Sequence, residues 1–314
     1  MKIAVSACLL GEKVRFDGGH KKDDFIVKQL SKYADYVPFC PEDLAFGSPR
    51  ESIRMVKKDE GLLLISNTAH TDVTQIVHNT AKQEFEKIQA HKVDAIILKS
   101  KSPTCGMKSS KVYLENGFIE GKTDGVFAKI CMDRYKHFPI EEEGRLNDPW
   151  LRENFMMQVF AYKAFEDFKE DAQMRGLVKF HQDAKFLLQS KDEKLYRELG
   201  RVVANHEKKD FQKVLQNYES LYKEAIAQKS TIKKTRNVLE HMTGFVKNFL
   251  DSDEKKLLHE QIEDYAVKII PVIVPISTLK LYAKKYKVDY LLEQNFLDPY
   301  PKELALRSDI RGGK

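Results

Sequence analysis

The sequence predicts a two-domain protein, with an α/β domain built on a mostly parallel sheet at residues 1–145 and an all-α helical bundle at residues 146–314. Short apolar runs alternate with helical segments in the first part, a pattern typical of βαβ units. After Trp150 the spacing of apolar residues is helical almost without interruption, as in a bundle. The length of 314 residues suffices for two domains, which commonly contain about 100–200 residues each.

The first domain is expected to open with a strand at residues 2–5, which a glycine-rich loop follows. A helix is predicted at residues 24–30, with Asp23 or Asp24 as its N-cap. A second strand is expected at residues 36–39. Polar loops therefore come directly after two apolar strands.

The rest of this domain contains further strand and helix signals. The helical pattern at residues 72–91 is expected to turn four side chains inward: Ile76, Thr80, Phe85 and Ile88. The pair Asn116-Gly117 marks a tight hairpin. The other predicted elements are strands at 62–65 and 95–98, hairpin strands at 111–114 and 118–119, and a helix at 125–133. The acidic run from Glu141 to Gly144 is expected to be the hinge between the domains.

In the second domain, three sets of apolar residues have the spacing of a single helix face. They are Leu151, Phe155, Val159 and Tyr162; Val214, Tyr218, Leu221 and Ala225; and Val238, Met242, Phe245 and Phe249. Residues 271–276 interrupt this pattern. We expect them to form a buried extended connector before a helix that begins at Pro275.

Composition and charge argue against a membrane-spanning or secreted protein and show a small excess of basic residues. No apolar run approaches the ~18 residues of a membrane span, and the chain starts with a strand-like segment in place of a signal peptide. We therefore expect a cytoplasmic protein with no membrane association, no evident obligate protein partner and four reduced cysteines. The net charge is +6, of which residues 151–314 carry +5 from 30 basic and 25 acidic residues. This excess is compatible with a polyanionic partner but is too small to establish one.

Three cysteines follow predicted strands. Cys8 and Cys40 each end a short apolar run, and Cys105 follows residues 94–98 through a polar loop. Since the carboxyl ends of parallel strands meet at one edge of a sheet, these thiols are expected to converge. Their separations of 32 and 65 positions match no short zinc or ferredoxin motif, so spacing alone favours ordinary buried thiols. The Gly, Pro and Ser residues around them argue for a site. Cys131 lies in a helical segment and is expected in the core.

Three segments resemble the motifs of the TudS-like thiouracil desulfidase family over roughly the first 140 residues: SACLLGEKVRFDGG, FCPEDLAFGSPR and LKSKSPTCG. The resemblance implies that Cys8, Cys40 and Cys105 hold a [4Fe-4S] cluster in which one iron has no protein ligand. Thiolates are the usual ligands of such clusters, and an open iron attracts soft sulfur and polarises a C=S bond as a Lewis acid does. Water then adds at carbon and sulfide leaves, with no net redox change.

The same resemblance points to residues that assist the reaction. Glu42 is expected to be the general acid or base, and Ser102 to position the water or the base, with Ser100 as an alternative to Ser102. Glu42 also has a structural interpretation, because Pro-Glu opens the first turn of many helices.

Four residues are candidates for binding the substrate: Arg15, Asp17, Arg50 and Ser100. An ion pair between Arg15 and Asp17 that holds their loop is an equally good interpretation. Arg50 either contacts a phosphate or base, or clamps its loop by hydrogen bonds to carbonyl groups. The family usually has Tyr at position 16 and Ser at position 104, where this chain has Phe16 and Thr104. These departures leave the cluster ligands unchanged but put hydroxyl functions at the two positions in doubt.

The second half resembles a YbgA-like all-helical domain over nearly all of residues 150–310, in segments such as LVKFHQDAKFLLQS and TRNVLEHMTGFVKNFL. After a TudS-like domain, this is the arrangement of the RudS-type desulfidases, which implies 4-thiouridine in tRNA as the substrate and a helical domain that holds the RNA. The candidate phosphate contacts are Lys229, Lys233, Lys234 and Arg236, with a second basic group at Lys280, Lys284, Lys285 and Lys287. The candidates for base stacking are Tyr222, Phe180, Phe186 and His181, although aromatic residues at helical spacing usually lie in a core.

The sequence thus predicts a desulfidase that converts 4-thiouridine in tRNA to uridine and releases sulfide in a non-redox, hydrolytic reaction. One alternative keeps this chemistry but acts on free thiouracil or thiouracil nucleotides. A second alternative is a non-catalytic RNA-binding module whose cysteines hold structural zinc.

Overall fold

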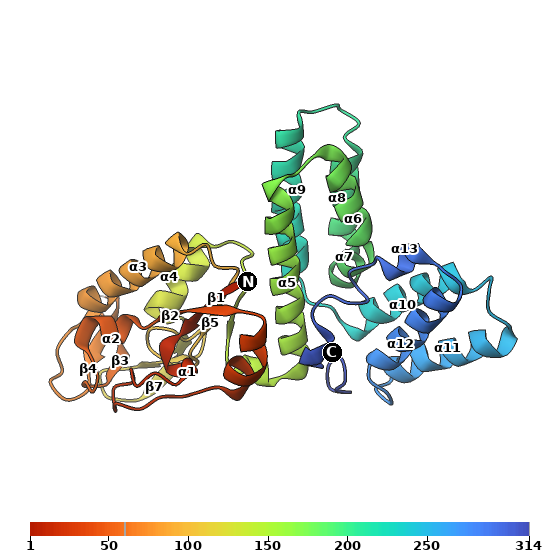
Figure 1. Cartoon of the computed structure of the whole chain (residues 1–314). Coiled ribbons are helices and arrows are strands. Elements are labelled where there is room, and N and C mark those ends of the chain that lie inside the picture. Colours follow the sequence, from red (N-terminus) through yellow and green to blue (C-terminus); the bar gives the residue numbers. More distant parts are fainter. Residues whose placement is uncertain (60, 314) are drawn as a thin grey trace. The chain divides into compact units, whose positions relative to one another are not determined.

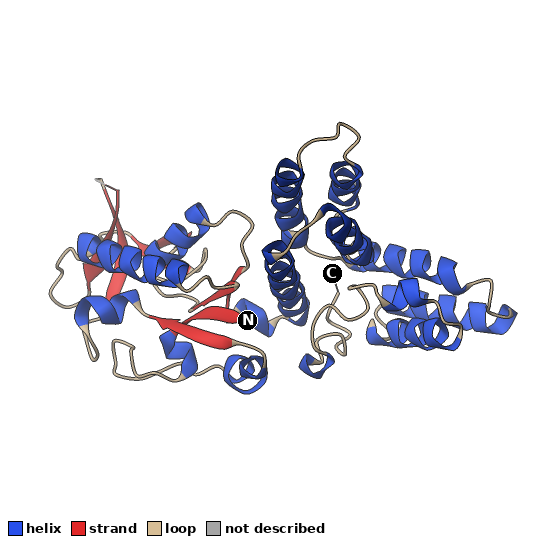
Figure 2. Cartoon of the chain, turned by 45° about the horizontal axis from the view of Figure 1, so that its top comes forward, coloured by secondary structure: helices blue, strands red, loops and turns tan. Residues whose placement is uncertain are grey.

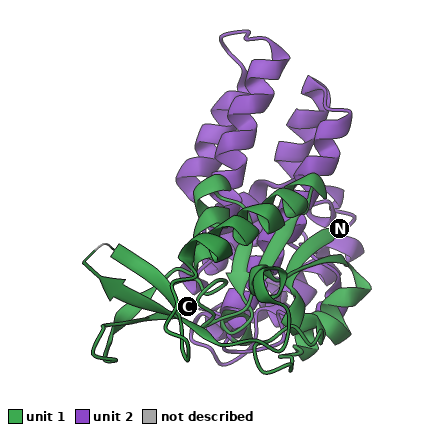
Figure 3. Cartoon of the chain, turned by 90° about the vertical axis from the view of Figure 1, so that its left-hand side faces the viewer, with its two compact units in different colours: residues 1–147 green, residues 148–314 purple. Residues whose placement is uncertain are grey.

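A computed structural model describes residues 1–59 and 61–313. The chain folds into two compact units, residues 1–147 and residues 148–314, which Figure 3 colours separately. All the described strands lie in the first unit, whereas the second is helical (Figure 2). The α/β and all-α classes predicted for the two parts are therefore confirmed. The sequence analysis places the boundary after residue 145, and the first unit ends at residue 147.

A four-stranded parallel sheet forms the centre of the first unit (Figure 1). Its strands, in spatial order, are β2 (Asp35–Phe39), β1 (Lys2–Ser6), β5 (Ala95–Leu98) and β8 (Ile140–Glu142). The central strands β1 and β5 are buried along almost their whole length, which explains why both have continuous apolar sequences. Helices α3 (Thr74–Ala90) and α4 (Val126–Arg134) contribute Phe85 and Phe127 to the core on this sheet.

A second, mixed sheet completes the first unit. Its strands are β4 (Gly61–Ser66), β3 (Ile53–Lys58), β6 (Ser110–Tyr113) and β7 (Ile119–Thr123). The β6–β7 pair is the antiparallel hairpin expected at Asn116-Gly117, and β4 is also predicted. The sequence analysis does not anticipate β3, because only Met55 and Val56 of this strand are buried and charged residues surround them. The parallel β3–β6 pair forms only in the tertiary structure.

Two helix predictions in this unit need correction. Residues 24–30 form a π-helical turn (Phe25–Gln29) and the start of a 3₁₀ turn (Leu30–Lys32) in place of an α-helix. The cap is Asp23, whose Oδ1 accepts a hydrogen bond from Ile26 N at 3.0 Å. On α3, Thr80, Phe85 and Ile88 are buried as predicted, whereas Ile76 is 49% exposed and Val77 is buried in its place.

The predicted hinge at residues 141–144 is wrong. Residues 140–142 are the edge strand β8, which pairs in parallel with β5, and Glu141 and Glu142 are buried. The acidic side chains are stable there because they accept hydrogen bonds inside the unit. Glu142, for example, accepts one from Met107 N at 2.6 Å. Two residues of an acidic run, a pattern that usually lies in solvent, are therefore part of the sheet.

The second unit consists of α-helices with short connections. They are α5 (Pro149–Glu170), α6 (Met174–Asp183), α7 (Lys185–Lys191), α8 (Glu193–Ala204), α9 (Phe211–Ala227), α10 (Ile232–Val246), α11 (Ser252–Ala266), α12 (Ile273–Lys285) and α13 (Asp289–Leu292). Local sequence signals fix several starts. Asp148 caps α5 ahead of Pro149, and Asp251 and Glu254 form a capping box on α11. Among the described residues, no helix combines the length and apolar character that a membrane span requires.

Two predictions for the helical unit are wrong in detail. The helix expected from Pro275 already begins at Ile273, so residues 271–276 are not an extended connector. Pro275 fits in the first turn because its missing N–H has no partner there in any case. The predicted face on α10 is only partly buried. Val238 and Met242 are enclosed, whereas Phe245 in the last turn and Phe249, three residues beyond the end of the helix, are 39% and 53% exposed.

A buried lysine links two helices of this unit. Lys191, at the end of α7, is 1% exposed, and its Nζ donates a hydrogen bond to Asn154 Oδ1 on α5 at 2.7 Å. Asn154 Oδ1 also accepts a hydrogen bond from Ser230 N at 2.7 Å. Burial lowers the pKa of Lys191 to about 7, so the folded unit favours a neutral amine more strongly than the unfolded chain does.

We expect the stability of the second unit to rise with pH between about 7 and 10. In this window the unfolded chain, with an ordinary lysine pKa near 10.4, binds more protons than the folded chain. Lys191→Met should flatten this dependence, and Lys194→Met, which removes a lysine with 86% of its side chain exposed, should leave it intact. Urea unfolding at pH 7 and pH 9.5 measures both. Equal pH slopes in the wild type and Lys191→Met would contradict the prediction.

Candidate active site

Three cysteines come together at the carboxyl edge of the parallel sheet. Cys8 lies in α1 (Ala7–Leu10), directly after β1, and Cys40 is the N-cap of α2 (Pro41–Phe46), directly after β2. Cys105 follows β5 in the loop before β6. These three strands are neighbours in one parallel sheet, so their carboxyl ends meet at one edge. As the strand ends predict, the three thiols line a single cavity, of about 360 Å³.

The surroundings of these thiols oppose their ionisation. Cys8 and Cys105 are 7% and 5% exposed. Burial raises the pKa of Cys8 to about 11 and that of Cys40 to about 12, and it raises the pKa of Cys105 well above its usual value. The positive charge of Lys99 lowers the pKa of Cys8 but does not offset burial. Without a bound cation these thiols are therefore favoured in the neutral form, and a bound metal ion or cluster would favour the thiolates.

The spacing of the thiols fits a group larger than one metal ion. A tetrahedral zinc ion, with Zn–S of about 2.3 Å, holds its sulfur ligands about 4 Å apart. Within residues 1–59 and 61–313, one triad of His, Cys, Asp or Glu has all its ligand atoms within 4.8 Å of one another, and it consists of Glu240, His259 and Glu263. The Sγ atoms of Cys8, Cys40 and Cys105 are thus not all within 4.8 Å of one another, a wider spacing than that around one zinc ion. In an iron–sulfur cluster each cysteine binds a different iron, so the ligand sulfurs lie farther apart.

Cys131 is separate from this group. It lies in α4, is 0% exposed, and packs in the core with Phe39 and Phe127. It does not line the cavity. The prediction that Cys131 is a core residue is confirmed.

Glu42, in the first turn of α2, lines the same cavity. Its Oε1 accepts hydrogen bonds from Ser102 Oγ at 3.1 Å and from the Thr104 hydroxyl. Its Oε2 accepts one from Arg50 Nη2 at 2.9 Å. A carboxylate offers about four acceptor sites, so within the described part of the chain one site stays available for water or substrate. Glu42 therefore lies in the first turn of a helix, as the structural interpretation predicts, and it also lines the cavity of the three thiols.

Ser102 orients both the carboxylate and the cysteine loop. Besides donating to Glu42, its Oγ accepts hydrogen bonds from Thr104 N and Cys105 N, each at 3.1 Å. Thr104 Oγ1 lies 2.8 Å from Ser102 Oγ and also donates to Glu42. The threonine that replaces the family's usual serine at position 104 therefore keeps the hydroxyl, and the doubt about this position is resolved.

Arg50 clamps its loop. Its side chain is 5% exposed. Apart from Glu42, it donates hydrogen bonds to Val14 O at 2.9 Å, Gly47 O at 3.0 Å and Ser48 Oγ at 2.9 Å. These hydrogen bonds engage the guanidinium with groups of the protein itself. The structure therefore favours the loop clamp over a contact of Arg50 with a substrate phosphate or base.

Arg15 and Asp17 form the ion pair of the structural alternative, with Nε and Oδ1 3.3 Å apart. The backbone N–H of Gly19 donates to Asp17 Oδ1 at 3.0 Å, and this bond is the largest cause that lowers the pKa of Asp17. Arg15 lines the cavity but Asp17 does not. Asp17 thus stabilises the turn, whereas Arg15 lies beside the cavity.

Ser100 lines the cavity, but its polar groups are held by Glu143. The carboxylate of Glu143 accepts from Ser100 N at 2.6 Å and from Ser100 Oγ at 2.9 Å, and it pairs with Lys99. The sequence analysis does not identify Lys99 or Glu143 as site residues. The signal in the sequence that could have identified them is the acidic run of residues 141–143 at the end of β8, because Glu142 and Glu143 accept hydrogen bonds from backbone N–H groups on the two sides of the Cys105 loop.

The lysines predicted to contact RNA at the start of α10 are partly engaged within the second unit. Lys234 Nζ donates to the backbone oxygens of Lys191 and, at 3.3 Å, of Lys229. Lys229 Nζ lies 5.9 Å from the centroid of the Trp150 ring. Lys233 is exposed. This end of α10 therefore offers less free positive charge than its sequence suggests.

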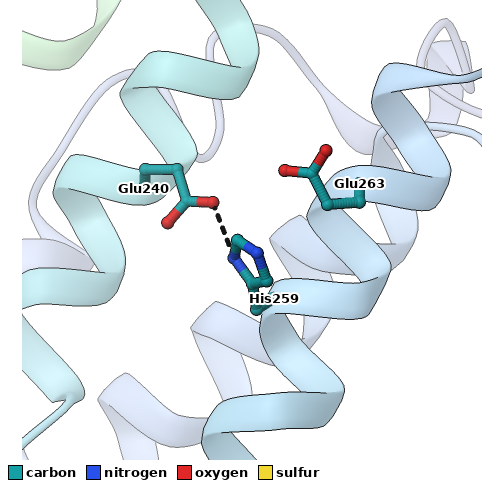
Figure 4. A group of neighbouring side chains, drawn as sticks. All are labelled: Glu240, His259 and Glu263. Atoms are coloured by element: carbon teal, nitrogen blue, oxygen red, sulfur yellow. Dashed lines mark hydrogen bonds and ion pairs between the residues drawn. The ribbon is translucent and has the colours of Figure 1, made fainter.

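Arg236 is also engaged, with Glu263 of a polar group between α10 and α11 that Figure 4 shows as Glu240, His259 and Glu263. Its Nε donates to Glu263 Oε1 at 2.8 Å, and His259 Nδ1 lies 3.0 Å from Glu240 Oε1. Each carboxylate in this group thus has a basic partner within the unit. The interactions join the two helices and occupy the guanidinium that was predicted to bind a phosphate.

Most of the predicted stacking residues are enclosed. Tyr222 and Phe186 are 1% and 0% exposed, so stacking of RNA bases on these two residues is excluded in this fold. His181 stacks on Tyr196, with ring centroids 5.3 Å apart, and burial lowers its pKa to about 4. Phe180 stacks on Phe168 at 5.0 Å. These aromatic residues mainly form the core, as their helical spacing allows.

Comparison with known proteins supports an assignment for both units. Residues 3–143 match the family described as 2-thiouracil desulfurase, and residues 185–301 match a protein family of unknown function, DUF1722. The uncharacterized protein YbbK of Bacillus subtilis (strain 168) is 30% identical over 155 residues, which are 46% of this chain and 98% of that protein. The uncharacterized protein YbgA of Escherichia coli (strain K12) is 25% identical over 154 residues, 48% of this chain and 91% of that protein.

Among solved structures, the chain is similar to the [4Fe-4S]-dependent thiouracil desulfidase TudS, with 27% identity and a TM-score of 0.37. The similarity covers 46% of this chain and 93% of that one. The two family matches and the near-complete coverage of YbbK come from the sequence and agree with the two compact units. Through residues 3–143 the chain belongs to the 2-thiouracil desulfurase family, and it joins this domain to a YbgA-like domain of the DUF1722 family.

Proposed function

We propose that the protein removes sulfur from 4-thiouridine in tRNA, leaving uridine and releasing sulfide. The observation that supports this most directly is the cavity in which Cys8, Cys40 and Cys105 face the carboxylate of Glu42. Three thiols and one carboxylate are a suitable set for a hydrolytic desulfidase, because sulfur needs a soft metal acceptor and water needs a base.

We further propose that the three cysteines hold a [4Fe-4S] cluster with one iron free of protein ligands. When bound, the cluster supplies an open coordination position that attracts the thiocarbonyl sulfur and polarises the C=S bond. The spacing of the thiols, wider than a shared zinc ion allows, supports this group over structural zinc. Cys131, buried in α4, leaves the fourth position open.

Residues of the chain then activate the water and transfer the protons. The Glu42 carboxylate, held by Arg50 and Thr104, takes a proton from water as its oxygen attacks the thiocarbonyl carbon. The C–S bond breaks as the C=O bond forms from the added hydroxyl, Glu42 returns its proton to the departing sulfur, and the proton of the hydroxyl is released to water. Atoms balance as thiocarbonyl plus water giving carbonyl plus hydrogen sulfide. Ser102 is a positioning residue, since it fixes Glu42 and the loop of Cys105 together.

Basic and aromatic residues that line the cavity support a phosphate-bearing substrate over free thiouracil. Arg15, Lys21 and Lys101 line the cavity together with Phe16. Both lysines are exposed, and Phe16 is 41% exposed. Lysine and arginine bind phosphates, and an exposed aromatic ring stacks on an unpaired base. Phe16 provides this face without a hydroxyl, so the change from the family's usual tyrosine retains the stacking surface.

Comparison of substrates tests this proposal. Protein prepared without oxygen should contain iron and acid-labile sulfide in matching amounts, with little zinc. It should release sulfide from tRNA that contains 4-thiouridine with a kcat/KM at least ~10-fold above that for free 2-thiouracil, since phosphate contacts and stacking each add binding energy of about 1 kcal/mol or more. Higher kcat/KM for the free base would reject the tRNA assignment, and zinc in place of iron would reject the cluster.

A further inference from the structure

Two pairs of stacked aromatic rings lie on the second unit at the end of α10. Phe245, in the last turn of α10, stacks on Tyr290 of α13, with ring centroids 5.0 Å apart. Four residues further on, Phe249 stacks on Tyr286, the C-cap of α12, with centroids 5.2 Å apart and ring planes at 15°. We call these four rings, together with Lys185 and Lys285, the aromatic ledge.

The two phenylalanines of the aromatic ledge are exposed although they continue a core pattern. Val238 and Met242, two turns and one turn before Phe245 on α10, are 1% and 0% exposed, whereas Phe245 and Phe249 are 39% and 53% exposed. The rest of the unit therefore covers this row of apolar side chains as far as Met242 and leaves Phe245 and Phe249 partly exposed. Exposed aromatic surface of this kind marks an interaction site more often than exposed single aliphatic residues do.

Each stacked pair has an ammonium group beside it. Lys185 Nζ lies 5.7 Å from the centroid of the Phe245 ring, and Lys285 Nζ lies 4.8 Å from that of Tyr286. Lys285 also pairs with Glu254 at 3.2 Å, yet 52% of its side chain is exposed. Lys185 forms no ion pair with a carboxylate in residues 1–59 and 61–313. The same combination, an aromatic pair with a positive charge, thus occurs twice in succession.

We propose that the aromatic ledge binds an unpaired segment of RNA, with bases stacked on Phe245 and Phe249 and phosphates paired with Lys185 and Lys285. The inference rests on the proposed function, which supplies an RNA substrate. Aromatic faces accept any base, and lysines bind the backbone without reading sequence, so the combination suits single strands. Double-stranded RNA fits poorly, because its bases are stacked and paired inside the helix.

The charges on the aromatic ledge favour RNA over a protein partner. An apolar protein surface that covers Phe245 and Phe249 would have to desolvate two ammonium groups, of which that of Lys185 has no carboxylate partner among the residues that the structure describes. RNA phosphates provide that compensation. The aromatic ledge also differs from the predicted RNA contacts at the start of α10, where Lys234 and Arg236 are engaged in the unit itself.

The test uses the full chain loaded with its cluster and two aromatic variants, Phe249→Ala and the double variant Phe245→Ala with Phe249→Ala. Base stacking contributes about 1–3 kcal/mol per base, so the single variant should weaken tRNA binding by ~10-fold and the double variant by more. Sulfide release from 4-thiouridine monophosphate should be unchanged in both. Phe249→Trp, which restores an aromatic face, should recover the affinity.

A matched control is Phe118→Ala, which removes a phenylalanine that is 72% exposed in the β6–β7 turn of the other unit. It should leave tRNA affinity unchanged. Lys185→Gln should lower the salt dependence of binding by about one phosphate contact. Far-UV circular dichroism and urea unfolding of each variant show that the second unit remains folded.

The two proposals fail in different ways. If the wild type desulfurises thiolated tRNA and Phe249→Ala binds that tRNA as tightly as the wild type, the aromatic ledge is not the RNA surface. If the aromatic variants change the oligomeric state and leave RNA affinity unaltered, the occupant is a protein and the inference is overturned. If the wild type binds tRNA through the aromatic ledge but releases no sulfide from it, the ledge stands and the proposed substrate is wrong.

Discussion

Replacing Cys8, Cys40 or Cys105 by alanine is expected to abolish sulfide release and to lower the iron content of the protein sharply. Each thiol is one of three at the cavity, and a cluster held by three ligands does not survive in place on two, because each lost thiolate leaves an iron unprotected. Iron and acid-labile sulfide analysis, together with the visible absorption of the cluster, measures the first effect. Sulfide release from thiolated tRNA measures the second.

Cys131→Ala is the matched control for these variants. It also removes a buried thiol from the same unit, but from the core around α4 rather than from the cavity. Its cost should be limited to a small core cavity, about 1 kcal/mol of stability, with iron content and activity near those of the wild type. Loss of the cluster in Cys131→Ala, or its retention in Cys40→Ala, would overturn the assignment of the ligands.

Glu42→Gln is expected to keep the cluster and to lower kcat by about 10²–10⁴-fold, the usual contribution of a general acid or base. Glutamine has nearly the same shape and can still accept from Ser102 and Thr104. It cannot take a proton from water, and it leaves the buried guanidinium of Arg50 without its carboxylate. Single-turnover sulfide release and the iron content of the variant separate the loss of chemistry from a loss of the cluster.

Glu84→Gln provides the control for this substitution. Glu84, on α3, is 6% exposed, and its Oε1 accepts a hydrogen bond from Cys40 N at 3.2 Å, but it does not line the cavity. The variant retains a carbonyl oxygen for that bond, so its activity should remain within a few-fold of the wild type. Wild-type activity in Glu42→Gln, or an equal loss in Glu84→Gln, would remove Glu42 from the proposed proton transfer.

Much of the secondary structure of the first unit can be predicted from local sequence patterns. A buried parallel strand is a short apolar run, and a loop residue directly after it lies at the carboxyl edge of the sheet. Cys8 and Cys40 follow β1 and β2 in this way, so their convergence needs no information beyond the order of strands. The hairpin at Asn116-Gly117 and the caps at Asp148 and Asp251 are equally local.

Other site residues depend on contacts between distant segments. Glu143 and Lys99 are 44 positions apart and meet only because β8 pairs with β5. Thr104 reaches Glu42 across 62 positions. In the sequence the run 141–143 looks like a solvated charge cluster, because nothing local shows that backbone N–H groups of the Cys105 loop will satisfy its carboxylates.

The sequence by itself determines the two-domain order, the α/β and helical classes, the family of the first domain and the three thiols at the sheet edge, since all of these follow from periodicity and from motifs that are continuous along the chain. Only the tertiary structure decides which charged and aromatic side chains remain available. Arg50, Lys234 and Arg236 are engaged by internal acceptors, whereas Phe245 and Phe249 stay exposed on a face with core spacing. The physical reason is that burial and pairing are set by neighbours far away in the sequence, which a local pattern does not contain.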